Sequence, residues 1–213
     1  ETVADAFWGS IEIDELPESL LVIGDLDGHI QQRLERCGKH VIPWCRWTVR
    51  AKQGTPWPPE ITVSGATIRL PKEKSALDLY LHGAASRLAL DCPLWLYGAN
   101  DEGIRSVGKR MVPLFSDVRT VATRRHCRIL SGHRTASNPQ EPLSSWLTTH
   151  AMPLPTGSVS WSSLPGVFAE GGLDPATSLL INTLPSNLGA ARALDFCCGT
   201  GTLAASLRMI NPE

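Results

Sequence analysis

The residues best suited to chemistry lie near the end of the sequence, where an acid, two cysteines and two glycines follow one another closely. Residues 193–203 read Ala-Leu-Asp-Phe-Cys-Cys-Gly-Thr-Gly-Thr-Leu. We interpret 193–196 as a short apolar strand, followed by a glycine turn and a helix that starts after Gly201. Glycines let a bound molecule approach the backbone, and the first N–H groups of a helix are unpaired donors. The pattern is typical of the nucleotide pocket of a Rossmann-type sheet.

Asp195 is the acid of this stretch, and two roles are open to its carboxylate. It could organise the N–H donors of the turn, or it could accept a hydrogen bond from the amine of a bound cofactor. The alternative to both is an ordinary connection between a strand and a helix that binds nothing.

The composition is that of a folded protein. The 213 residues are 42% hydrophobic and 19% charged, which suits one large domain, or one domain and part of another. No apolar run approaches the length of a membrane span, and residues 1–10 lack the pattern of a secretory signal. The six cysteines show no C-x-x-C pair and no paired spacing with histidines. We therefore expect no membrane, no metal and a reduced compartment: the cytoplasm, or an organellar matrix after removal of a transit peptide.

The charges are spread unevenly along the chain. Residues 1–32 carry eight acids and no Lys or Arg, whereas residues 105–134 carry eight Lys or Arg and one acid. A basic segment of this kind is compatible with a polyanionic partner such as RNA, and equally with a solvated face that aids solubility. The candidate RNA contacts are Arg119, Arg124, Arg125 and Arg128.

Strand and helix patterns alternate along the first two thirds of the chain. The apolar runs predict strands at 20–24, 44–49, 66–70, 93–97, 118–122 and 127–130. Helical spacing predicts helices at 31–37, 74–90 and 104–114. Strands that alternate with helices imply an α/β fold with a mainly parallel sheet covered on both faces.

The composition changes near Thr135, where proline, serine and threonine become frequent. We expect a first domain over 1–134, a connector over 135–163 and a second unit over 164–213. In the second unit, 177–184 is predicted to be helical, and 193–196 is predicted to be the first strand of a second sheet.

Four segments carry a resemblance to a known family. Residues 163–180, Ser-Leu-Pro-Gly-Val-Phe-Ala-Glu-Gly-Gly-Leu-Asp-Pro-Ala-Thr-Ser-Leu-Leu, resemble the segment that precedes the S-adenosylmethionine (SAM) motif in bacterial ribosomal RNA guanine-N2 methyltransferases. Residues 94–106 are similar to the G-x-N-x-x-G-[IV]-[RK]-S turn of that family's N-terminal domain, and 69–74 to its L-P-K-x-K segment. The glycine turn matches D-x-G-x-G-x-G, with Cys197 in place of the first glycine.

The resemblance implies two tandem Rossmann-like methyltransferase domains. In that family the N-terminal copy is degenerate, lacks a usable SAM site and helps to fold the protein or to hold RNA. The C-terminal copy binds SAM and methylates the exocyclic amine of a guanine in ribosomal RNA. The implied cofactor-binding residues, with the last three over the pocket, are Asp195, Cys197, Gly199, Gly201, Phe168, Asp174 and Thr177.

The sequence departs from the family at its catalytic motif. The N-P-P-[FY] motif, whose carbonyl and amide groups hold the reacting amine, does not occur, and Asn211-Pro212 lies too close to Gly201 to replace it. Positioning is most of the catalysis in this displacement. We therefore expect a fragment of a longer enzyme that is inactive as these 213 residues, with no catalytic residue identified. The alternative is a non-catalytic RNA-binding or ribosome-assembly factor that keeps the fold.

Two other features of the sequence, the acidic turn after residue 24 and His126, could also take part in chemistry. Asp25 and Asp27 follow an apolar run, as in the D-x-D-G start of haloacid-dehalogenase-type phosphatases. Gly24-Asp25 with His29 also resembles a metallophosphoesterase motif. The other motifs of those enzymes are not recognisable, so an acidic turn after a buried strand is the preferred interpretation. His126 is interpreted as a neighbour of the basic segment rather than as a general base.

Overall fold

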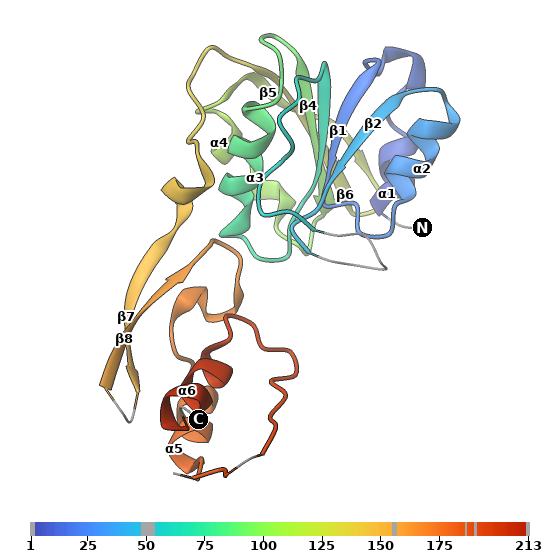
Figure 1. Ribbon diagram of the computed structural model, residues 1–213. Coiled ribbons are helices and arrows are strands. Elements are labelled where there is room, and N and C mark those ends of the chain that lie inside the picture. The colour runs from blue at the N-terminus through green and yellow to red at the C-terminus, as the bar shows by residue number, and fades with distance from the viewer. Residues whose placement is uncertain (1–2, 48–53, 155–156, 186, 190, 212–213) are drawn as a thin grey trace. The chain divides into compact units, whose positions relative to one another are not determined.

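The computed structural model describes residues 3–47, 54–154, 157–185, 187–189 and 191–211. The chain divides into two compact units, Glu1–Ser145 and Trp146–Glu213, called here the N-terminal unit and the C-terminal unit. Figure 1 shows a sheet covered by helices in the N-terminal unit, and a hairpin and two helices in the C-terminal unit.

The N-terminal unit is built on a six-stranded sheet of order β2-β1-β3-β4-β6-β5. The strands are β1 (Ser19–Ile23), β2 (His40–Trp44), β3 (Gly65–Arg69), β4 (Pro93–Ala99), β5 (Phe115–Arg124) and β6 (Cys127–Arg134). The first four strands of that order run parallel, and β6 is antiparallel to both of its neighbours. The predicted α/β class with a mainly parallel sheet is therefore confirmed.

The central strands are apolar because both of their faces are buried. Leu20, Leu21, Val22 and Ile23 of β1 are all buried, a run typical of parallel strands covered on both sides. On one face of the sheet, a single apolar cluster includes residues of two helices, α1 (Val3–Trp8) and α2 (His29–Arg36). Its buried members are Phe7, Leu16, Leu20, Val22, Ile30, Leu34, Trp95, Tyr97 and Ile129.

The other face of the sheet is covered by α3 (Ala76–Ala85) (Figure 1). The Tyr80 ring of this helix lies 5.3 Å from the Trp44 ring of β2, centroid to centroid. The remaining helical turns of the N-terminal unit are η1 (Ile13–Glu15), η2 (Ile104–Ser106), α4 (Gly108–Met111) and the start of η3 (Leu143–Trp146).

Several predicted boundaries were wrong. The strand predicted at 44–49 ends at Trp44 and begins earlier, at His40; residues 45–47 form no strand, and 48–49 lie outside the described residues. β2 is an edge strand, which tolerates Pro43 because one side of its backbone needs no ladder bond. The helix predicted over 104–114 is divided into η2 and α4, and α3 is shorter than the predicted 74–90.

The C-terminal unit begins with a β-hairpin. Its strands β7 (Thr148–Leu154) and β8 (Gly157–Ser163) pair antiparallel, so the segment predicted as a connector contains regular structure. The hairpin is followed by η4 (Phe168–Gly171), α5 (Pro175–Thr183) and α6 (Thr202–Ile210). The predicted helix at 177–184 therefore corresponds to α5.

The strand predicted at 193–196 is not formed. Residues 191–195 have no helix or strand, and the Leu194 and Phe196 side chains are 87% and 84% exposed. A parallel strand needs neighbouring strands for its ladder and a covered face for its apolar side chains. In the described part of this unit, β7 and β8 pair with each other, and no strand lies beside residues 193–196. The sequence pattern was strand-like, but the tertiary partner that it requires is absent from the described residues.

Candidate functional site

The glycine turn of the C-terminal unit is held by Asp195. Its carboxylate accepts a hydrogen bond from the Ala204 N–H at 3.0 Å, in the first turn of α6. The N-cap of α6 is Gly201, which has no side chain to cap the helix. Asp195 therefore supplies the missing cap from upstream of the turn, and of the two roles considered for it, the geometry favours organising the turn.

Three residues of the turn adopt the left-handed conformation. Gly199 and Gly201 have φ angles of +56° and +77°, and Cys197 has +60°. A Cβ atom built at Gly199 or Gly201 would meet no other atom within 4 Å, so the space over both glycines is open. Cys197 places a side chain, exposed to solvent, where the methyltransferase pattern has glycine. The turn thus fits a ligand that approaches its backbone closely.

Asp174 and Thr177 are brought together at the start of α5. Asp174 is the N-cap, and its carboxylate accepts from the Ala176 and Thr177 N–H groups, both at 3.1 Å, and from the Thr177 hydroxyl. The hydrogen bonds from Thr177 hold the pKa of the Asp174 carboxyl below its usual value. Phe168 lies apart on η4 with its side chain 72% exposed. A role for these three residues over a cofactor stays a prediction.

The four candidate RNA-binding arginines lie on one hairpin but not on one face. Register pairs Arg119 with Ser131 and Arg124 with Cys127, on the face that carries Ile129. Arg128 is one residue away from both Cys127 and Ile129, so it points to the opposite face. Arg125 and His126, at φ +44° and +65°, form the turn between the strands. Arg124 donates to the Gly9 carbonyl oxygen at 2.8 Å.

The two family motifs of the N-terminal unit, 69–74 and 94–106, lie next to each other. Arg69 of the first motif pairs with Glu102 of the second through hydrogen bonds of 2.8 and 2.5 Å. Glu102 also accepts from the Ala99 N–H at 2.7 Å. Burial alone would raise the pKa of the Glu102 carboxyl, but the hydrogen bonds and the charge of Arg69 outweigh it and lower the pKa. Gly98 is needed because a Cβ there would lie 2.8 Å from the Leu70 Cβ.

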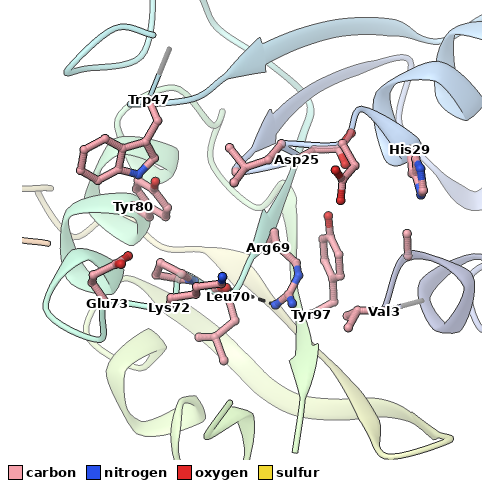
Figure 2. A pocket seen from close by; sticks show the side chains of 15 residues that line it. Val3, Asp25, His29, Trp47, Arg69, Leu70, Lys72, Glu73, Tyr80 and Tyr97 are labelled. Atoms are coloured by element: carbon pink, nitrogen blue, oxygen red, sulfur yellow. Dashed lines mark hydrogen bonds between the residues drawn. The ribbon is translucent and has the colours of Figure 1, made fainter. Parts of the chain in front are cut away.

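Sequence reasoning missed a cavity in the N-terminal unit. It has a volume of about 470 Å³ and lies where β1, β3 and β4 end (Figure 2). Its lining includes Asp25 and Asp27 after β1, Arg69 and Lys72 after β3, and the aromatic residues Trp47, Tyr80 and Tyr97. Burial raises the pKa of Tyr80 to about 12, and burial and Asp25 raise that of Tyr97 further, so both phenols stay protonated. The glycines and acids that follow β1 in the sequence were the signal from which this cavity could have been predicted.

The acidic turn of this cavity has a structural role of its own. Asp25 accepts a hydrogen bond from the Gln31 N–H at 2.9 Å, in the first turn of α2, whose N-cap is Gly28. This is the same arrangement as Asp195 with α6. Within the described residues, no group of three His, Cys, Asp or Glu side chains is placed to hold a metal ion. In the same residues, no helix has the length and apolar character needed to cross a membrane.

Comparison with known protein families shows which family the chain belongs to. The family "Methyltransferase small domain N-terminal" matches residues 12–150, and "Methyltransferase small domain" matches residues 158–213. The chain belongs to the methyltransferase small domain family. This confirms the resemblance seen in the sequence motifs.

Similar proteins share one description. The chain is 30% identical over 207 residues to a "Ribosomal RNA small subunit methyltransferase C" of Shewanella sp. (strain MR-4), covering 94% of this chain and 58% of that protein. It is 37% identical over 157 residues to the protein of the same name from Pseudomonas fluorescens, covering 73% and 46%. The chain thus spans about half the length of these curated relatives.

A solved structure supports the fold of this methyltransferase small domain protein. A 16S rRNA N2 methyltransferase of T. thermophilus, in complex with AdoMet and guanosine, superposes with a TM-score of 0.71. The match covers 85% of this chain and 51% of that one, at 21% sequence identity. The overall architecture is therefore shared.

Proposed function

We propose that the chain belongs to a SAM-dependent enzyme that methylates the N2 amine of guanine in ribosomal RNA. The observation that carries the proposal is the turn at 195–201, where Asp195 holds the start of α6 and the space over two left-handed glycines is open. The names of the relatives support the ribosomal RNA substrate. Such a substrate places the activity in the compartment that contains ribosomes, the cytoplasm or an organellar matrix.

The residues proposed to hold SAM act through the backbone. Gly199 and Gly201 would admit the methionine part of the cofactor, and the N–H groups at the start of α6 that Asp195 does not take would be donors for its carboxylate. When bound, SAM supplies an electrophilic methyl group on a sulfonium. Asp195 keeps the turn in place by its bond to Ala204, and Cys197 adds an exposed side chain where the family pattern has glycine.

A matched pair of glycine variants tests this assignment. Gly199 and Gly189 both have φ +56°, and a Cβ added at either would meet no atom within 4 Å, but Gly189 lies outside the turn. We expect Gly199→Val, in the full product of the reading frame, to weaken SAM binding by about tenfold or more in calorimetry. Gly189→Val should leave it unchanged. Equal SAM affinity of both variants and the parent protein would contradict the assignment.

The second candidate is a non-catalytic RNA-binding or ribosome-assembly factor. The observation that favours it is the set of exposed basic residues along β5 and the turn that follows it. These residues would contact RNA whether or not the protein is catalytic. Transfer of label from SAM to ribosomal RNA separates the two functions. Stoichiometric labelling of N2 on one guanine supports the enzyme, and RNA binding without transfer by the full product supports the factor.

A further inference from the structure

The segment that leads out of the N-terminal unit is not fastened by apolar burial. Every side chain of residues 136–145 is exposed or half-buried. The start of the segment is fixed at Thr135, whose N–H and hydroxyl both donate to the Leu114 carbonyl oxygen at 3.0 Å. The C-terminal unit begins directly after the segment, at Trp146. The contacts made by residues 136–145 therefore set where the free connection between the two units starts.

Two polar contacts near the end of α3 hold the middle of this segment, and together they are called here the clasp. His82, in the last turn of α3, accepts a hydrogen bond at Nδ1 from the Gln140 N–H at 2.7 Å. Arg87, just after the helix, donates to the Glu141 carboxylate at 3.2 Å. Arg87 is itself held by a hydrogen bond of 2.7 Å to the Pro59 carbonyl oxygen.

The segment is loosely packed beside the clasp. Arg87, Glu141 and Pro142 line a cavity of about 450 Å³ together with residues from the loop before β3, among them Trp57 and Ile61. A polypeptide segment that borders a cavity and buries no side chain gives up few apolar contacts when it moves. Opening of the clasp therefore leaves the core of the N-terminal unit covered.

The two contacts of the clasp respond differently to pH. A backbone N–H can only donate, so the bond from Gln140 requires a free lone pair on His82 Nδ1, which only the neutral imidazole has. The protonated imidazole carries hydrogen on both ring nitrogens, and two donors would then face each other. The Arg87–Glu141 pair persists at that pH, because a carboxylate is protonated only in more acidic solution. A fall in pH thus removes one contact before the other.

The groups around His82 favour its neutral form. Burial is the largest cause and lowers the pKa of His82, Asp78 of α3 acts in the opposite direction, and Arg134 of β6 lowers the pKa as well. The other charged groups of the clasp, Arg87 and Glu141, are paired with each other. Because the pKa in the folded protein is below the usual value, the contact is present near neutral pH and is lost as the pH falls through the folded value.

We propose that His82 is a pH-sensitive fastener of the connection between the two units: neutral His82 holds Gln140 on α3, and protonated His82 releases it. The ion pair of Glu141 is then the remaining contact of the clasp. Once this pair also opens, residues 136–145 form a free segment that spans roughly 17 Å. The clasp thereby sets the freedom of the unit that contains the turn at 195–201, whatever that turn binds.

Amide hydrogen exchange of the 213-residue protein, followed by NMR spectroscopy, measures the clasp at Gln140. The Cε1 proton of His82 reports the titration of the imidazole in the same sample. We expect the protection factor of the Gln140 amide to fall by about threefold to tenfold as His82 is protonated, because one hydrogen bond is lost. Both residues belong to the N-terminal unit, so the result depends neither on SAM binding nor on the stability of the C-terminal unit.

Two variants separate the acceptor of His82 from its titration. His82→Asn places an amide oxygen near the position of Nδ1 and does not titrate, so the protection of the Gln140 amide should persist in acidic solution. His82→Phe keeps a ring without an acceptor, and the protection should be lost already at neutral pH. His126→Asn, at an exposed histidine in the turn between β5 and β6, is the matched control and should behave like the parent protein. Circular dichroism verifies that each variant is folded.

Three outcomes would overturn the proposal. An unprotected Gln140 amide in the parent protein at neutral pH would show that the bond to His82 does not hold the segment in solution. Protection that stays constant while His82 titrates would show that protonation does not open the clasp. An equal loss of protection in His82→Asn and in the parent would assign the pH dependence to another group, such as Glu141 or Asp78. If His82→Phe does not fold, the parent protein and His82→Asn still decide among these outcomes.

Discussion

Single aspartates fix the start of three helices in this chain. Asp174 caps α5 directly, whereas Asp25 and Asp195 reach the first turn of α2 and α6 from upstream of a glycine N-cap. A carboxylate near a helix N-terminus satisfies an unpaired N–H and interacts well with the helix dipole. Asp25 and Asp195 thus play the same part at the start of α2 and of α6.

A first prediction for single residues concerns the Arg69–Glu102 ion pair. Both side chains are about one quarter exposed, so we expect Glu102→Gln to lower the free energy of unfolding by about 1.5–3 kcal/mol at neutral pH. The pKa of Glu102 is lowered in the folded protein, so its contribution is present above the unfolded pKa and is lost as pH falls through the folded value.

Urea unfolding between neutral and acidic pH measures this contribution. The stabilities of the parent protein and Glu102→Gln should converge at low pH, where the carboxyl is protonated in both states. Glu35→Gln, which changes an exposed glutamate of α2, serves as the control. A stability difference that stays constant down to low pH would contradict the assignment to the ionised carboxylate.

At the scale of elements, the β5–β6 hairpin determines which basic residues can act together. Arg119 and the turn residue Arg125 are exposed, whereas Arg128 faces the other side of the sheet. If RNA lies along the edge of β5, Arg119→Gln and Arg125→Gln should each reduce the log–log salt slope of RNA binding by about 0.7–0.9. Arg36→Gln, at an exposed position of α2, is the control. Unchanged slopes would mean that the basic residues of this hairpin form a solvated surface and do not contact RNA.

Elements with local signals were predictable from the sequence, and elements that depend on partners were not. The buried runs at β1, β3 and β4 are recognisable because both faces of a parallel strand are apolar. The separation of Arg128 from Arg119 depends on strand register, which the charge pattern does not contain. The cavity depends on side chains from three strands, of which only the acids after β1 stood out in the sequence. Residues 193–196 had the pattern of a strand but no partner among the described residues.

At the scale of the whole molecule, the two units differ in how much they bury. Among the residues whose burial the structure describes, Met152 and Ile181 are the only fully buried apolar side chains of the C-terminal unit. The N-terminal unit holds all the others, on both faces of its six-stranded sheet. Regions with few buried apolar contacts open at a lower free energy than a packed core. The C-terminal unit of these 213 residues should therefore open locally long before the N-terminal unit unfolds.

Limited proteolysis of the 213-residue protein tests this difference in local stability. No Lys or Arg occurs between Arg134 and Arg192, so chymotrypsin or thermolysin is the protease of choice for residues 135–191. We expect the first cuts near Leu143–Trp146 and Leu147, then loss of the C-terminal unit while a fragment of the N-terminal unit persists. Cleavage of the open state tracks its population when reclosing is fast, so the ratio of the two degradation rates reports the difference in opening free energy. Trypsin, acting at Arg192 and Arg208, should give the same order of loss. Equal resistance of both units to all three proteases would show that the C-terminal unit has stability of its own that its few buried side chains do not explain.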